Sequence, residues 1–223
     1  MTEKRFGSLA SIPIALFATS LWLGLAIWGR GGFTAFFAHP ARTALVVVTF
    51  ALMAAAAFTQ GNLSTGQQED RANRPFLYLM LVIGTLDGWL PAYCDRVGIF
   101  VFGGDDVRWL GVALFAIGGV IRIVPVFVLD RRFSGLVAIQ EGHRLVTGGI
   151  YGVIRNPSYL GLLISLFGWA LAFRSWAGAA LAVLFIPPLI VRMQSEERLL
   201  GKHFGAEYEA YRARTWRLIP WVY

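Results

Sequence analysis

The sequence predicts an all-α protein that lies in a membrane, a polytopic bundle of five or six transmembrane helices. Hydrophobic residues make up 57% of the 223 positions and charged residues only 15%, with a mean hydropathy of +0.60. Ordinary soluble domains carry about 25% charged residues. The apolar residues are also grouped in long blocks, several near the roughly 20 residues that cross a bilayer. The 17 Phe and 8 Trp exclude a disordered or collagen-like chain.

Residues 1–129 are expected to form the first part of the bundle, with about four spans. The first block follows Lys4 and Arg5, and its length and lack of a small-residue exit favour a retained span over a cleaved signal peptide. A polar loop, residues 60–74, ends at Pro75, a residue favoured in the first helical turn. The four apolar blocks cover about 9–28, 43–58, 76–93 and 107–129.

Two charged residues fall deep inside these blocks, Asp87 in the third and Arg122 in the fourth. A charge in the membrane interior is costly, so such residues are functional candidates by default. We expect the two to face each other or a polar cavity within the bundle.

Residues 130–223 form the second part. The segment 130–158 is too polar to cross a bilayer. Two short apolar blocks follow, separated only by Arg174 and Ser175, and they predict a tight helical hairpin over 159–191. Its second helix should break or kink at Pro187 and Pro188. The polar and amphipathic residues 192–223 predict a cytoplasmic helix and an extended tail.

The distribution of Lys and Arg predicts the orientation of six spans. Fourteen of these residues fall on the side of the N-terminus and five on the other side, with Arg122 inside the membrane. Because positive residues favour the cytoplasmic side, both termini and the segment 130–158 are expected in the cytoplasm. The five on the other side are Arg30, Arg42, Arg96, Arg108 and Arg174.

The net charge of +7 is explained by this membrane topology and the attraction of anionic lipid, so no nucleic-acid partner is expected. One Cys and three scattered His provide no ligand spacing for a metal, and none is predicted. Cys94 is interpreted as a small apolar residue at the end of a span.

The two polar segments flank the hairpin, and the chain itself brings them together. On a helix, Arg192 and Glu196 are four residues apart and share a face. Spacing alone favours an ordinary surface ion pair, worth about 0.3–0.5 kcal/mol. The position of Arg192 where a span emerges, with Arg155 entering from the other segment, favours a functional site instead.

The order of motifs from residue 130 onward resembles the isoprenylcysteine carboxyl methyltransferases and their prokaryotic membrane relatives. These motifs are HRLVTGGIY (143–151), RNPSY (155–159), the Glu196–Glu197 pair, FGAEYEAY (204–211) and RLIP (217–220). The family often has His at the place of Asn156, which can still hydrogen-bond and turn the chain but cannot titrate. Residues 1–100 match only as generic membrane helices.

The resemblance implies S-adenosylmethionine as methyl donor, with S-adenosylhomocysteine as product, bound by a C-terminal cytoplasmic segment rather than by a Rossmann domain. It implies catalytic roles for Arg192, Glu196 and Arg155, with Arg192 holding the substrate carboxylate as a fork-shaped cation. Arg155 could grip the donor or fix Glu196. The implied cofactor-binding residues are Gln140, His143, Arg144, Leu145, Val146, Tyr151, Asn156, Pro157, Ser158, Tyr159 and Glu196.

The function implied is carboxyl O-methylation of an isoprenylcysteine-like or other amphiphilic acid taken from the bilayer, in a prokaryotic cytoplasmic membrane. One alternative is N- or S-methylation of a phospholipid or small amphiphile by the same pocket. A more distant alternative is a non-catalytic membrane scaffold or transporter, although no internal repeat is present.

Overall fold

A computed structural model describes residues 4–57, 68–69, 74–129, 138–139 and 145–223, and the side chains of most of these. In the described part the chain is almost entirely helical, and its short β1 and β2 pair in antiparallel fashion. The elements in order are α1 (Lys4–Arg30), α2 (Phe33–Phe37), α3 (Pro40–Ala57), β1 (Gln68–Glu69), α4 (Arg74–Val97), α5 (Asp105–Leu129), β2 (Ala138–Ile139), the 3-10 helix η3 (Gly149–Gly152), α6 (Pro157–Ala172), α7 (Trp176–Leu184), α8 (Ile186–Phe204) and α9 (Ala206–Ala213).

The predicted all-α membrane bundle is confirmed. Within the described residues, four helical stretches are long and apolar enough to cross a membrane, and two apolar helices are shorter. The number of spans stays a prediction. The four are Pro13–Arg30, Arg74–Val97, Asp105–Pro125 and Trp176–Phe204, and the shorter ones are Pro40–Ala56 and Pro157–Ala172.

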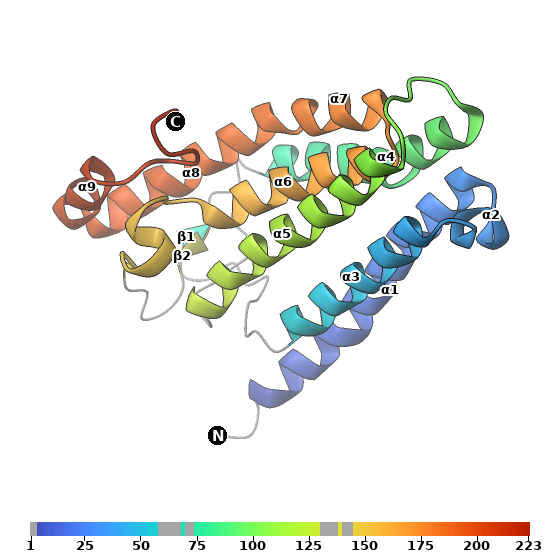
Figure 1. Cartoon of the computed structure of the whole chain (residues 1–223). Coiled ribbons are helices and arrows are strands. Elements are labelled where there is room, and N and C mark those ends of the chain that lie inside the picture. The colour runs from blue at the N-terminus through green and yellow to red at the C-terminus, as the bar shows by residue number, and fades with distance from the viewer. Residues whose placement is uncertain (1–3, 58–67, 70–73, 130–137, 140–144) are drawn as a thin grey trace.

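The bundle has two distinct ends (Figure 1). The C-terminal half of α8, together with α9 and the C-terminal tail, lies at one end, and α2 lies at the other. The end of α4, the start of α5 and the turn between α6 and α7 lie with α2. The N-terminus of α6 lies at the α9 end, so the two segments predicted to form the site meet at one end of the bundle.

Helices α7 and α8 run nearly as one long helix. The interruption lies at Phe185, two residues before Pro187, where the break was expected. Pro187 and Pro188 fit the first turn of α8 because a missing N–H is harmless there. No second break follows, and buried Leu189 and Met193 continue one apolar stripe. Arg192 therefore lies within the helix that leaves the apolar bundle, not on a separate helix.

Helices α5 and α6 form the most extensive helix pair, and four glycines explain it. A Cβ atom on Gly111 or Gly118 of α5 would overlap the backbone of α6. A Cβ on Gly161 or Gly168 of α6 would overlap the backbone of α5. Small residues let membrane helices approach until their backbones touch, which gains dispersion contacts where water supplies no hydrophobic force. This contact positions the start of α6 and therefore the site.

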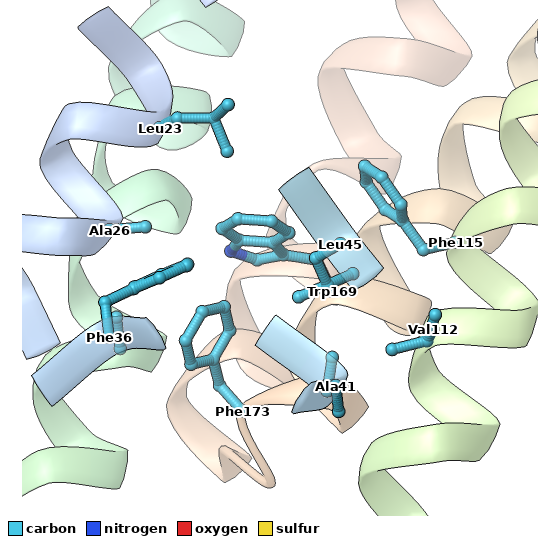
Figure 2. Close-up of a cluster of buried hydrophobic side chains, with 11 residues drawn as sticks. Leu23, Ala26, Phe36, Ala41, Leu45, Val112, Phe115, Trp169 and Phe173 are labelled. Carbon is cyan, nitrogen blue, oxygen red and sulfur yellow. The ribbon is translucent and has the colours of Figure 1, made fainter. Parts of the chain in front are cut away.

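The core near the α2 end is built around Trp169, which is fully buried (Figure 2). Phe36, Phe173, Leu45 and Phe115 surround its ring. Its indole N–H donates to the backbone oxygen of Asp87 at 2.8 Å, which satisfies the polar atom inside an apolar cluster.

Of the two arrangements expected for Asp87 and Arg122, the one in which they face each other is wrong. The Asp87 side chain is buried, and its carboxylate makes no hydrogen bond to any residue that the structure describes. Arg122 instead lies within electrostatic range of Tyr159 and Arg192. The sequence identified two charges inside the membrane, but the helix rotations that separate them come from packing.

Candidate active site

The centre of the candidate site is a tyrosine hydroxyl that joins two charged side chains of α8. Arg192 Nε donates to the Tyr159 hydroxyl oxygen at 2.6 Å, and that hydroxyl donates to Glu196 Oε1 at 2.7 Å. Arg192 Nη2 lies 3.7 Å from the same carboxylate oxygen. Arg192 and Glu196 share one face of α8, as their spacing predicts, and α6 brings Tyr159 between them.

The interpretation as a surface ion pair is excluded by burial. The Arg192 side chain is only 5% exposed, whereas that of Glu196 retains 26%. A guanidinium removed from water must be held by hydrogen bonds or by a counter-charge. The site therefore presents a buried cation toward the bundle and a partly open carboxylate toward the polar end.

The segment before α6 reaches the same end of α8. Strand β2 lies against α8, and Tyr151 in η3 is buried. Burial raises the pKa of the Tyr151 phenol, and the nearby Glu196 carboxylate raises it further. The Tyr151 phenol and the Glu196 carboxylate thus lie within electrostatic range of each other, so both polar segments contribute to this end of the bundle.

A second carboxylate, Glu197, ties the C-terminal tail to this segment. Arg155 Nε donates to Glu197 Oε1 at 3.0 Å, and Arg217 Nε donates to Glu197 Oε2 at 3.0 Å. The hydrogen bond that Arg217 donates to Glu197 raises the pKa of Arg217, and the one it donates to the Tyr223 hydroxyl raises it further. Arg155 also donates to the backbone oxygens of Arg212 and Thr215. Arg155 therefore holds Glu197, and the hypothesis that it fixes Glu196 is wrong.

Backbone pairing strengthens this connection. Ile154 and Trp216 form a short parallel bridge, with Arg155 N donating to Trp216 O at 2.8 Å. The Asn156 side-chain amide donates to Arg217 O at 3.0 Å. Asn156 thus holds the tail as a neutral hydrogen-bond donor, a role that needs no titrating ring.

The two tyrosines of the FGAEYEAY motif pack against the segment that contains Tyr151. Gly205 has a φ of +55°, a conformation that glycine adopts without strain, and it ends α8 so that α9 can turn back. Tyr208 and Tyr211 are then buried, and the Tyr211 hydroxyl donates to Tyr151 O at 2.8 Å. Burial raises the pKa of Tyr211 to about 12, so this hydroxyl remains protonated at neutral pH.

The structure describes most of the residues predicted to bind the donor. Leu145 and Val146 are partly buried just before η3, and Pro157 is buried at the start of α6. The Ser158 hydroxyl donates to Arg122 O at 3.2 Å, which joins α6 to α5. The predictions for Gln140, His143 and Arg144 lie outside the described residues.

Sequence reasoning missed the importance of Glu197, Arg217 and Tyr211. The adjacent glutamates and the arginine before Leu-Ile-Pro were visible as motifs, but their partners were not. A surface cavity of about 450 Å³ lies beside Glu197, and Arg192, Glu196 and Tyr159 are not among the described residues that line it. The lining residues are Gln194, Glu197, Arg198, Gly201, Lys202, Glu209, Arg212 and Arg217.

Comparisons with known proteins show what the chain is similar to. A family model described as phospholipid methyltransferase matches residues 107–207. The protein-S-isoprenylcysteine O-methyltransferase B of Arabidopsis thaliana is 31% identical over 131 residues, 56% of this chain and 66% of the relative. By these matches the chain is similar to the isoprenylcysteine carboxyl methyltransferases, as its motifs predict. The solved structure of the eukaryotic intramembrane Ras methyltransferase ICMT (isoprenylcysteine carboxyl methyltransferase) superposes with a TM-score of 0.56 at 16% identity, covering 97% of this chain and 84% of that one.

The likeness to that isoprenylcysteine carboxyl methyltransferase structure shows a common fold. The chain spans slightly under two thirds of the length of the curated isoprenylcysteine methyltransferases first matched. A steroid 5-alpha-reductase of Solanum lycopersicum is also 27% identical over 152 residues, 66% of this chain and 54% of that protein. Because the relatives include a reductase, the chemistry of this chain rests on its own site residues.

Proposed function

We propose that this integral membrane protein is an S-adenosylmethionine-dependent methyltransferase that esterifies the carboxylate of a lipophilic acid, with an isoprenylcysteine-like acid as the best candidate. The observation that carries this proposal is the buried Arg192, held through Tyr159 beside the partly open Glu196. A cation at the edge of the apolar bundle suits an acid whose tail remains in the lipid. The termini and the site are assigned to the cytoplasmic face of a prokaryotic inner membrane.

The donor side of the site fits a cationic, amino-bearing ligand. Glu196 is an acceptor, and its 26% exposure leaves room for a hydrogen bond from an incoming donor group. The segment around Leu145, Val146 and η3 is rich in glycine and offers backbone amides and carbonyls. S-adenosylmethionine, when bound, supplies an electrophilic methyl group on a sulfonium. Glu196, Tyr151 and residues 145–159 are proposed to hold it, and Gln140, His143 and Arg144 are proposed to join them.

The acceptor side depends on Arg192. A carboxylate is already ionised at neutral pH, so its oxygen needs alignment rather than deprotonation. Arg192 stays protonated and can hold one carboxylate oxygen through its guanidinium while the other attacks. Tyr159 fixes the guanidinium plane through Nε. Arg155 is assigned to positioning, because its guanidinium is already bonded to Glu197 and to the tail.

A labelled-methyl assay tests the activity. The full-length protein, purified in detergent, is incubated with labelled S-adenosylmethionine and a short farnesylated cysteine acid. We expect lipid-soluble label that mild base releases as volatile methanol, because methyl esters hydrolyse and N-methyl groups do not. Absence of methylation of this acid and of every acidic lipid fraction would overturn carboxyl methylation.

The phospholipid alternative is favoured by the family-model match and is separated by its pH dependence. An amine acceptor must lose its proton before it attacks, so its rate should rise with pH toward the amine pKa. A carboxylate acceptor is ionised throughout the neutral range and should show no such basic limb. A base-stable product whose formation rises with pH would favour methylation of an amine.

Replacing Glu196 by glutamine should weaken S-adenosylhomocysteine binding by about tenfold or more, the usual loss when a charge-assisted hydrogen bond is removed. Isothermal titration calorimetry of the purified variant measures it. Glu209→Gln, an exposed residue of α9, is the matched control and should bind like wild type. Unchanged affinity in Glu196→Gln would remove Glu196 from the donor site. If the wild-type protein binds no S-adenosylhomocysteine even at a large excess of ligand, that result would favour a non-catalytic scaffold.

A further inference from the structure

Four arginines converge on one buried aspartate at the end of the bundle opposite the candidate active site. Arg108 donates to both carboxylate oxygens of Asp95, at 2.7 and 3.1 Å. Arg174 Nη2 donates to Asp95 Oδ1 at 3.2 Å. Arg30 Nε and Arg42 Nη1 lie 3.5 and 3.6 Å from Oδ2. The Asp95 side chain is completely buried. Five arginines are predicted on the side of the membrane opposite the termini, and four of them thus meet at a single carboxylate.

Two of the four arginines have structural partners that account for their burial. Arg42 donates to Phe36 O at 2.6 Å and to Ala35 O at 3.1 Å, which caps the end of α2. Arg108 donates to Ala172 O at 3.1 Å, at the end of α6. Both side chains are almost fully buried, so they form the inner layer of the cluster.

Arg30 and Arg174 form the outer layer. Their side chains are 22% and 25% exposed, which makes them accessible from outside the bundle. Their Nε atoms are buried inside the cluster, and that of Arg30 faces Asp95 Oδ2 at 3.5 Å. Arg174 also donates to Gly103 O at 3.0 Å, which holds its guanidinium in place.

The charges of this cluster do not balance. Four guanidinium groups surround Asp95, and one of them, that of Arg108, also lies 3.6 Å from Asp105, which is largely exposed and also bonded to His39. The described residues of the cluster therefore carry a surplus of two positive charges. Like charges gathered at low dielectric repel each other unless an anion joins them.

The surrounding side chains place this cluster at the level of lipid headgroups. Trp and Tyr gather at membrane–water interfaces, where the ring lies in the apolar layer and the N–H or hydroxyl remains wet. Exposed aromatic residues occur at the same end of the bundle, on several elements around the cluster. They are Trp28, Phe33, Phe100, Trp109 and Trp176.

We propose that Arg30 and Arg174 form a binding site for a phosphate-bearing anion at this end of the bundle. Guanidinium groups match phosphate oxygens, and these two contact the same carboxylate, Arg30 at Oδ2 and Arg174 at Oδ1. The exposed aromatic residues around the cluster favour an anionic phospholipid as the molecule that supplies the phosphate group. Inorganic phosphate has the same chemistry. The site is independent of the proposed methyl transfer.

Thermal unfolding of the full-length protein in neutral detergent tests this site. Phosphatidylglycerol is added, with a neutral galactolipid as the lipid that lacks phosphate and inorganic phosphate at matched ionic strength as the soluble source. We expect phosphatidylglycerol to raise the Tm by about 5 °C near saturation and the galactolipid to leave it unchanged. A rise with inorganic phosphate as well would assign the site to phosphate in general.

The double variant Arg30→Gln/Arg174→Gln should lose this rise in Tm. Arg96→Gln, an exposed arginine at the same end that stacks on Tyr93, should retain it and controls for general surface charge. Equal stabilisation by the galactolipid, or an unchanged rise in the double variant, would overturn the proposal. Should the double variant not fold, native mass spectrometry of the wild type decides, because the site requires phosphatidylglycerol to be retained in preference to galactolipid.

Discussion

Replacing Arg192 with alanine should abolish methyl transfer to an acidic acceptor while leaving the affinity for S-adenosylhomocysteine nearly unchanged. Arg192 is the buried cation of the site, and its Nε donates to the Tyr159 hydroxyl, while Glu196 and residues 145–158 are left in place to hold the donor. Loss of one preorganised charge-stabilising group typically lowers kcat by about 10²–10³-fold. The labelled-methyl assay measures the rate, and calorimetry measures the affinity for S-adenosylhomocysteine.

Arg192→Lys is the matched control because it keeps the charge and loses the planar fork. Its rate should fall between those of wild type and Arg192→Ala. Tyr159→Phe removes only the hydroxyl that bridges Arg192 and Glu196, so it should impair both turnover and donor affinity. Mild and equal losses in Arg192→Ala and Glu196→Ala would return the pair to a purely structural role.

The largest loss of stability is expected from Glu197→Ala. This carboxylate is 8% exposed and binds Arg155, also 8% exposed, and Arg217. Removing one member of a buried ion pair strands the partner charges and costs about 3–5 kcal/mol. The tail should detach from residues 153–156, so the variant should show a lower Tm and faster proteolysis after α9.

Glu209→Gln provides the comparison, because Glu209 pairs with Arg212 on the exposed surface of the same region. Exposed pairs contribute at most about 1 kcal/mol. Similar Tm values and cleavage rates for Glu197→Ala and Glu209→Gln would show that the tail is held by its backbone bridge alone. Glu197→Ala should also weaken donor binding indirectly, through the displaced Asn156 and Tyr151 segment.

The helical elements were predictable because a helix that crosses a membrane requires a recognisable stretch of apolar residues along the chain. A span needs an uninterrupted apolar stretch, and its ends are marked by charge, Gly or Pro. Boundaries were less certain where a signal has two interpretations. Pro187 and Pro188 predict a helix break at their own position, whereas in the structure they occupy the first turn of α8, just after the break.

Part of the candidate site was also visible, because Arg192 and Glu196 are neighbours along one helix and their proximity follows from helix geometry. Arg155 was visible as a residue of the RNPSY motif, but its partner, Glu197, was not. Adjacent glutamates point about 100° apart on a helix, so Glu196 and Glu197 must meet different neighbours. Which of them meets Arg155 depends on how α8 is rotated against α6.

The sequence alone therefore determined the membrane class, the helices and the segments that contain the candidate site residues, since composition and spacing are local properties. Only the tertiary structure decided the contacts between segments. The backbone contact of α5 with α6 brings Tyr159 to Arg192, and the helix ends gather four arginines around Asp95. These pairings depend on helix rotation and depth, which follow from the packing of all side chains together and leave no local signal.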